Sequence, residues 1–186
     1  MTQTNSQPPY GERERQFVRR VLEQCKKDNG FAARLRRADN PDTEHYALGD
    51  LCALGVNIEK DEERLPFALI AAALSRDADT MNADGALGIG AALRRCLPDE
   101  EAETSPRLRR LLACESLHET CQVLRPMLSL VRRKGVRLGY ARLLQDLRSF
   151  RFGKDAAQKT KRQWVSDFYR KAAASEKDGE TRQGEA

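Results

Sequence analysis

Cationic side chains are the groups in this sequence with the clearest chemical potential, and they gather in one part of the chain. From Arg107 to Lys171 the sequence holds seventeen Arg and Lys residues against five acidic residues, a local charge of +12. Residues 1–106 have a net charge of −5 and residues 172–186 a net charge of −2, so the whole chain is only +5. This asymmetry predicts a polyanionic partner for the C-terminal half. The alternative is a basic helical surface that is simply solvated.

Guanidinium groups bind phosphate oxygens through paired hydrogen bonds, and each neutralised phosphate of a nucleic acid releases condensed counterions. Neither effect reads base sequence. The aromatic residues occur at core spacing, so the sequence gives no support for a platform on which single-stranded bases stack. We therefore predict a groove that follows the nucleic-acid backbone. Its predicted residues are Arg107, Arg110, Arg132, Arg133, Lys134, Arg137, Arg142, Lys161 and Arg162.

Catalytic and metal-binding patterns are missing from the sequence. His45 and His118 stand apart, without Cys, Asp or Glu at the spacing of metal ligands. The segment Gly88–Leu93 resembles a dinucleotide-binding loop in two glycines but lacks the third glycine and a preceding strand. The five cysteines form no CxxC pair and lie in apolar-periodic stretches, where a free Cys acts as a small hydrophobic residue. We predict a protein without catalysis, metal or cofactor, in a reducing cytoplasm.

The elements that would position the basic residues are helices. Leu, Ala, Arg and Glu dominate, and alternating β-branched runs are absent, which predicts an all-α fold of about eight helices. Ser105-Pro106 and Ser116-Leu-His-Glu119 are typical helix starts. Pro66 predicts a helix start or a kink, and Pro126 predicts a kink. The expected helices cover residues 12–27, 31–38, 45–54, 61–74, 91–97, 107–114, 117–134 and 138–152, with a last helix capped by Asp155.

The acidic run at residues 99–103 predicts a boundary between two packed helical bundles, residues 12–98 and the basic residues 104–172. The polar segments 1–11 and 175–186 are expected to be disordered. We expect no signal peptide, because the first sixteen residues lack an apolar run. The longest apolar segment, Leu65–Leu74, is too short to cross a bilayer, which needs about 20 residues. No membrane association is predicted.

Several short motifs occur in an order that resembles a known family. The motifs are Asn29-Gly30, Leu35-Arg36-Arg37, Leu69–Leu74, Gly85–Gly90 followed by Ala91-Ala92-Leu93, Arg107–Leu112, Leu124-Arg125, Leu138–Leu144 and Trp164–Tyr169. Over about residues 17–169 the chain resembles the small subunit (the CasB type) of the type I-E CRISPR surveillance complex, Cascade.

The resemblance implies two helical bundles and a non-catalytic subunit of antiviral defence. It implies that two copies assemble along the guide RNA, beside the backbone and large subunits of the complex. In that place the family binds guide RNA and target DNA and holds the R-loop open through the displaced non-target strand.

The resemblance also implies further binding residues. Arg36, Arg37, Arg107 and Arg125 match arginines that recur in the family, and Arg64 falls near another basic family position. Ala91 and Pro126 depart from the pattern, because some members have basic residues there. For Arg36 and Arg37, ion pairing with the acidic N-terminal half is an equal alternative.

Two other functions fit the same sequence. A helical adaptor would use its basic half to bind an acidic protein partner. A helix-turn-helix regulator would read DNA bases with one recognition helix, and it would prefer one operator sequence.

Overall fold

The computed structural model describes residues 11–77, 85–98 and 105–180, with residues 171–180 described by their backbone alone. Those residues form an all-α fold, which confirms the predicted fold class. The N-terminal part contains α1 (Glu12–Lys27), α2 (Asn29–Leu35), the 3-10 helix η1 (Glu44–Tyr46), α3 (Leu48–Ala53) and α4 (Asp61–Asp77). The C-terminal part contains α5 (Ile89–Cys96), α7 (Pro106–Ala113), α8 (Leu117–Arg133), α9 (Tyr140–Ser149), η2 (Phe150–Phe152) and α10 (Lys154–Glu180).

Two predicted serine caps are confirmed. The Ser105 Oγ accepts a hydrogen bond from the Leu108 amide at 3.3 Å, and the Ser116 Oγ accepts one from the Glu119 amide at 3.1 Å. The Glu119 carboxylate in turn accepts from the Glu115 amide at 2.8 Å. Each cap satisfies an amide that has no partner within its own helix, so α7 and α8 begin where local chemistry places them.

Four local predictions differ from the structure. α2 begins at Asn29, because Asp28 caps it by accepting from the Gly30 amide at 2.7 Å. The expected helix 45–54 is divided into η1 and α3. α4 begins at Asp61, so the alternative helix start at Pro66 is wrong. Pro66 and Pro126 both lie inside helices, and the kinks expected at them stay predictions. α10 begins at Lys154 rather than after Asp155, and it extends to Glu180, past the expected start of the polar tail.

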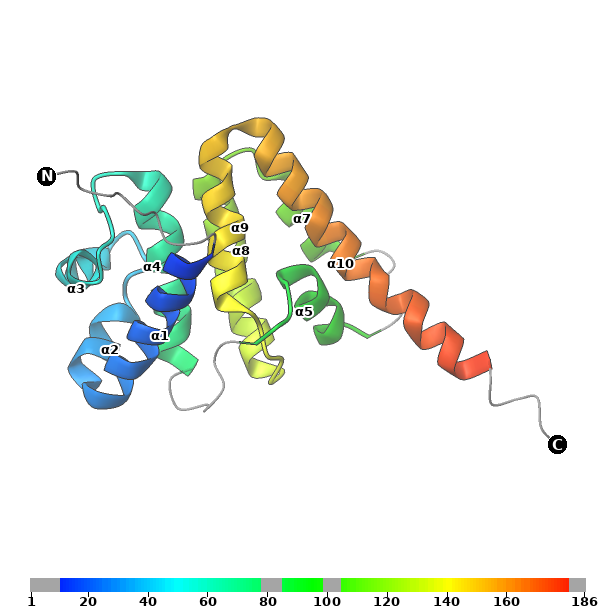
Figure 1. Ribbon diagram of the computed structural model, residues 1–186, viewed down its shortest axis with the longest axis horizontal. Coiled ribbons are helices and arrows are strands. Elements are labelled where there is room, and N and C mark those ends of the chain that lie inside the picture. Colours follow the sequence, from blue (N-terminus) through cyan, green and yellow to red (C-terminus); the bar gives the residue numbers. More distant parts are fainter. Residues whose placement is uncertain (1–10, 78–84, 99–104, 181–186) are drawn as a thin grey trace, which may run out of the picture.

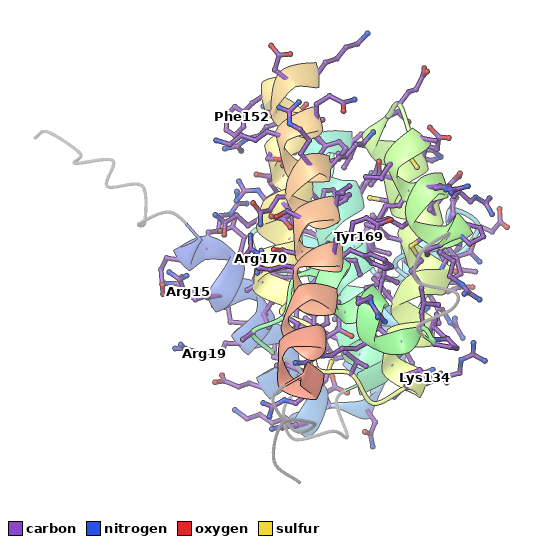
Figure 2. All side chains as sticks on the ribbon, turned by 90° about the vertical axis from the view of Figure 1, so that its right-hand side faces the viewer. Arg15, Arg19, Lys134, Phe152, Tyr169 and Arg170 are labelled. Carbon is purple, nitrogen blue, oxygen red and sulfur yellow. The ribbon has the colours of Figure 1, made fainter. Side chains whose placement is uncertain are left out.

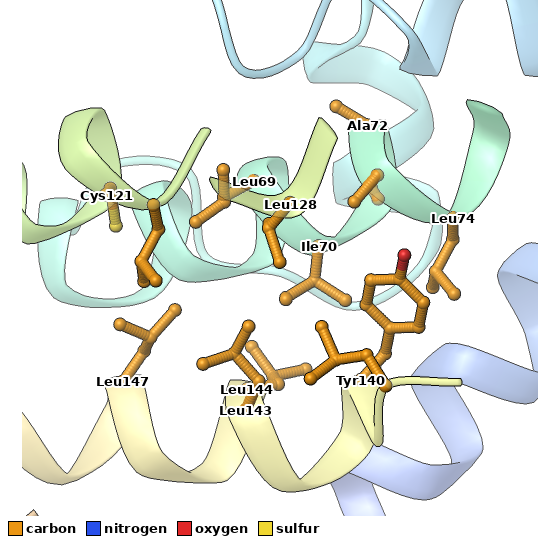
Figure 3. Close-up of a cluster of buried hydrophobic side chains, with 14 of the residues drawn as sticks. Leu69, Ile70, Ala72, Leu74, Cys121, Leu128, Tyr140, Leu143, Leu144 and Leu147 are labelled. Atoms are coloured by element: carbon orange, nitrogen blue, oxygen red, sulfur yellow. The ribbon is translucent and has the colours of Figure 1, made fainter. Parts of the chain in front are cut away.

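α4 is the most deeply buried helix, because residues Phe67 to Leu74 are all buried. A helix that is apolar on every side requires neighbours on every side, and α4 contacts α1, α2, α8 and α9. Figure 3 shows part of this packing, with Ile70 of α4 facing Leu144 of α9. In Figure 1, α8 and α9 occupy the middle of the molecule, between α1–α4 on one side and α5, α7 and α10 on the other.

The core does not separate into two along the chain. One cluster of buried side chains extends from Phe17 to Phe168. α5, which the sequence assigned to the N-terminal bundle, packs mainly against α10 of the C-terminal part and also contacts α8. Long-range packing thus overrides chain order for this short helix. The acidic run proposed as the boundary lies outside the described residues.

The backbone of the glycine-rich segment before α5 is hydrogen-bonded to the backbone of the segment before α9. The Gly85 amide donates to the Leu138 carbonyl at 2.7 Å, and the Gly139 amide donates to the Leu87 carbonyl at 2.8 Å. A Cβ atom on Gly139 would lie 2.8 Å from the Gly85 carbonyl oxygen, which is too close for any side chain. These glycines therefore permit close backbone contact between two segments.

Candidate nucleic-acid interface

Asp39 organises the first group of basic residues. Its side chain is only 3% exposed and accepts from both terminal nitrogens of Arg76, at 2.8 and 2.9 Å. The Arg125 Nε lies 3.5 Å from the same carboxylate. Arg76 also donates to the Arg36 carbonyl at 2.6 Å, and the Arg36 Nε donates to the Ser75 carbonyl at 3.2 Å. One buried carboxylate thereby fixes residues from the end of α2, the end of α4 and the middle of α8.

The charge of this group is positive. Arg132 joins it, since Arg76, Arg125 and Arg132 line one small cavity of about 10 Å³ with Asp39. Arg125 and Arg132 are seven positions apart on α8, a spacing of two helical turns that places them on one face. Three arginines, Arg76, Arg125 and Arg132, thus lie around a single buried acid, and Arg36 is joined to them through its backbone carbonyl. Such fixed guanidinium groups are suited to phosphate oxygens.

A second group of basic residues lies near Cys96, at the end of α5. Burial raises the pKa of the Cys96 thiol, and the nearby charges of Lys134 and Arg107 act in the opposite direction. This effect places Lys134 (after α8) and Arg107 (in α7) close to the same thiol. α5 itself has Arg94 and Arg95 in its last turn. Cations at a helix C-terminus are favoured by the helix dipole.

The two groups come close in the sequence at the C-terminal end of α8. Arg132 belongs to the first, and Lys134 belongs to the second, only two positions further along the chain. Arg133 and Arg137 are exposed beside them. Figure 2 shows Lys134 at the lower end of α8, next to α5. We call this set the basic strip. Its members are Arg36, Arg76, Arg94, Arg95, Arg107, Arg125, Arg132, Arg133, Lys134 and Arg137.

The basic strip includes seven of the thirteen predicted binding residues, and three others have partners within the fold. Arg64 forms ion pairs with Glu44 and with Asp61, the latter at 2.7 Å. Arg142 forms an ion pair with the buried Asp167 at 2.5 Å. Arg37 lies over the Tyr46 ring, with its guanidinium carbon 4.8 Å from the ring centre.

The predicted role of Lys161 requires a correction. Its side chain was predicted to line the groove, but the residue is only 5% exposed. Its ammonium donates to the Leu112 carbonyl at 3.0 Å and to the Cys114 carbonyl. The Leu112 carbonyl lies in the last turn of α7, and the Cys114 carbonyl directly follows that helix. Lys161 therefore holds the end of α7 against α10. Arg162, the next residue, is exposed, as is Arg110 on α7.

Sequence reasoning missed Asp39, Arg76, Arg94 and Arg95. A usable signal existed for the three arginines, because each follows a buried apolar run at the end of a helix. Asp39 gave no signal, since its partners lie 37 and 86 positions away. The expectation that all aromatics are in the core also needs correction. Tyr46 is 51% exposed, Tyr169 47% and Phe152 65%.

Other chemical groups point to no second kind of site. Within the described residues, no group of three or more His, Cys, Asp and Glu is placed to hold a metal ion. Burial raises the pKa of Cys25 to about 11 and that of Cys121 to about 12, so these side chains remain thiols. In the described part of the chain, no helix is long and apolar enough to span a membrane.

Comparisons with known proteins identify a matching family and a similar fold. The model of a family described as CRISPR-associated protein Cse2 matches residues 32–169. The fold is similar to that in the crystal structure of CasB from Thermobifida fusca, with a TM-score of 0.62 and 23% sequence identity. That similarity covers 86% of this chain and 97% of the CasB chain. No curated protein sequence is a significant match.

Proposed function

This chain belongs to the Cse2 family of CRISPR-associated proteins, and from that membership we propose a specific role for it within the Cascade complex. The role is non-catalytic. The chain holds the displaced non-target DNA strand of the R-loop through backbone phosphates, without reading its bases. Its partners in this proposal are the guide RNA, the target DNA, the backbone and large subunits of the complex, and a second copy of itself. Its site of action is the cytoplasm.

The basic strip is the observation that supports this role best. Its arginines come from α2, α4, α5, α7 and α8, and the first group is held in place by Asp39. Arginines that are already fixed lose less side-chain entropy when they bind phosphate than mobile ones do. The exchange of a DNA duplex for a guide–target duplex is nearly balanced in energy. A few phosphate contacts to the displaced strand are therefore sufficient to favour the open R-loop.

A salt titration tests the binding. The isolated full-length chain is mixed with fluorescent single-stranded DNA of several sequences, and affinity is measured between about 50 and 200 mM salt. The logarithm of affinity should fall linearly with the logarithm of salt for every sequence. Each phosphate contact removed from a single strand lowers the slope by about 0.7. Arg107→Ala and Lys134→Ala should therefore each reduce both affinity and slope.

A matched control is available on α1. Arg19 is exposed there, away from Lys134 in Figure 2, and Arg19→Ala removes the same charge. Its effect on slope should be much smaller. Binding that does not depend on salt would overturn the proposal in favour of a protein-binding adaptor. Preference for one duplex sequence would favour a helix-turn-helix regulator instead.

The role in the R-loop requires the assembled complex. Arg133→Ala should reduce protection of the displaced strand against a single-strand-specific nuclease, while the chain stays folded and remains in the complex. If protection is unchanged in both Arg107→Ala and Arg133→Ala, the basic strip does not hold that strand.

A further inference from the structure

The outer face of α10 carries Arg162, a predicted binding residue that is not part of the basic strip. Arg162 and Tyr169 are both exposed, and their spacing of seven positions is two helical turns, which places them on one face of the helix. Lys159 is exposed three positions before Arg162, and Arg170 is exposed directly after Tyr169. We call these four residues the α10 stripe.

The exposed charge of the α10 stripe is entirely positive. Between residues 156 and 170 the exposed charged side chains are Lys159, Arg162 and Arg170. The acid of this segment, Asp167, is only 8% exposed, and its oxygens accept from Arg142 at 2.5 Å and from Gln163 at 2.8 Å. In the first turn of α10, Lys154 and Asp155 are also exposed, and their charges cancel. The α10 stripe therefore favours an anionic ligand.

Two of these cations are available to such a ligand. Among the described residues, neither Lys159 nor Arg162 forms an ion pair. The Arg170 guanidinium donates to the Ser166 Oγ at 3.2 Å and lies 3.9 Å from the Asp167 carboxylate, but 71% of its side chain is exposed. Phosphate oxygens can therefore reach Lys159 and Arg162 without breaking a contact within the fold.

Tyr169 adds a flat aromatic surface to these charges. Its ring meets the buried Phe168 ring edge-on, at 5.1 Å between the ring centres, and the residue is 47% exposed. Tyr46 and Phe152 are exposed as well, but a guanidinium lies over each of their rings. Every nucleobase has a flat face, so an aromatic ring that is open to solvent beside cations is suited to single-stranded nucleic acid.

The α10 stripe lies near the second group of the basic strip. α5, which carries Arg94 and Arg95 of that group, packs mainly against α10. In Figure 2, α10 crosses the front of the molecule with Tyr169 and Arg170 near its middle, and the green α5 lies beside its lower part, between α10 and Lys134. One nucleic-acid strand can therefore contact both surfaces.

We propose that the α10 stripe binds single-stranded nucleic acid by stacking one base on the Tyr169 ring, while Lys159 and Arg162 bind nearby phosphates. This inference rests on the proposed function and adds to it a way of selecting the displaced strand over duplex DNA. Phosphates are present in both forms, so the basic strip alone does not distinguish them. The bases of a duplex are already paired and stacked on each other, whereas those of a single strand are free to stack on Tyr169. Stacking accepts any base, which agrees with binding that does not read sequence.

Affinities of the full-length chain for fluorescent single-stranded DNA and for a duplex of the same sequence test this inference. Tyr169→Ala should lower the affinity for the single strand by about fivefold or more, the loss typical of one stacked base. The salt slope should not change, because no cation is removed. The affinity for the duplex should also be unchanged. Tyr169→Trp should retain the affinity for the single strand, because its ring can stack as well.

Phe152→Ala is the matched control. It also removes an exposed aromatic ring, and Figure 2 shows Phe152 at the upper end of the molecule, far from Tyr169. Its affinities for single strand and duplex should both equal those of the unaltered chain. If Tyr169→Ala lowers the two affinities equally, Tyr169 does not select single strands and the inference is wrong.

Photo-crosslinking of the unaltered chain locates the stacked base directly. Single-stranded DNA that carries 5-bromodeoxyuridine should crosslink to Tyr169, as mapped by mass spectrometry of the digested protein. The same label in the displaced strand should crosslink to Tyr169 in the assembled complex. Crosslinks that fall only on other residues would overturn the inference.

The titrations also distinguish failure of this inference from failure of the proposed function. If Arg107→Ala lowers the salt slope but Tyr169→Ala binds single strands as the unaltered chain does, the proposed function stands and this inference alone is wrong. If the unaltered chain binds neither form of DNA, both are wrong.

Discussion

Gly90 of α5 packs directly against the backbone of Trp164 in α10. A Cβ atom at Gly90 would lie 2.9 Å from the Trp164 carbonyl carbon and 3.1 Å from the Phe168 amide nitrogen. The side chains of Trp164 and Phe168 are fully buried. The two helix backbones therefore approach each other at a point where only glycine fits. This contact sets the position of α5, and with it the position of Arg94 and Arg95 in the basic strip.

Gly90→Ala should destabilise the protein by about 2–3 kcal/mol, because backbone atoms cannot yield as a flexible side chain would. Urea unfolding measures this change. Gly49→Ala is the control, because Gly49 also lies in a helix but has no atom within 4 Å of an added Cβ. That substitution should be neutral or stabilise by up to about 1 kcal/mol. Equal effects of the two substitutions would contradict the direct packing.

Asp146 should make stability depend on pH. Burial raises its pKa from 3.8 to about 6, against the opposing hydrogen bond from the Trp164 indole. Between these values the folded state retains a proton that the unfolded state has released. The contribution of Asp146 to stability is therefore greatest below about pH 4, decreases as the pH rises to 6, and is constant above that.

Asp146→Asn should abolish this dependence. The Asn side-chain oxygen can still accept from the Trp164 Nε1, which lies 2.8 Å from the carboxylate. At pH 7 the variant should be more stable than the unaltered chain by about 1–3 kcal/mol, and at pH 4 the difference should nearly vanish. Urea unfolding of both proteins across this range checks the prediction. A difference that does not vary with pH would refute the assigned cause.

Substitutions at Lys161 and Arg162 should have different effects: the first should lower stability, and the second should weaken DNA binding. Lys161→Met leaves the carbonyls of Leu112 and Cys114 without their donor, which should cost about 2–4 kcal/mol. Arg162→Met removes the same charge from an exposed position and should alter stability by less than about 0.5 kcal/mol. Below its unfolding temperature, the Lys161 variant should bind single-stranded DNA normally, whereas the Arg162 variant should bind more weakly. The reverse pattern in a salt titration would return Lys161 to the binding surface.

The Glu14–Arg148 ion pair should behave as a buried pair. It joins α1 to α9, with side-chain exposures of 6% and 12%, and the Arg148 guanidinium also lies over the Phe67 ring. Arg148→Met leaves Glu14 buried without its partner and should cost about 3–5 kcal/mol. The double variant Glu14→Met with Arg148→Met should be more stable than Arg148→Met alone. A double-mutant cycle in urea measures this coupling, and simple addition of the two single effects would show that the pair is not coupled.

The local features of the fold could be predicted from sequence because their causes are local. α1 has the predicted bounds Glu12–Lys27, and the caps at Ser105 and Ser116 form hydrogen bonds within three residues. The apolar spacing of α8 and α9 identified buried residues such as Leu128 and Leu144. The place of α5 could not be predicted in this way, because it depends on Gly90 meeting a helix whose contact residue lies 74 positions later.

The local charge of +12 was also a property of the sequence alone. Tertiary structure decided which of those charges reach solvent, because neighbours on a helix point in different directions. The Lys161 side chain is buried and donates to two backbone carbonyls, whereas Arg162 beside it is exposed. Tertiary structure likewise brought in Arg76 from the acidic half of the chain and joined it to Arg125 through Asp39. Charge is additive along a chain, but a binding surface depends on burial and on contacts between distant residues, and only folding fixes these.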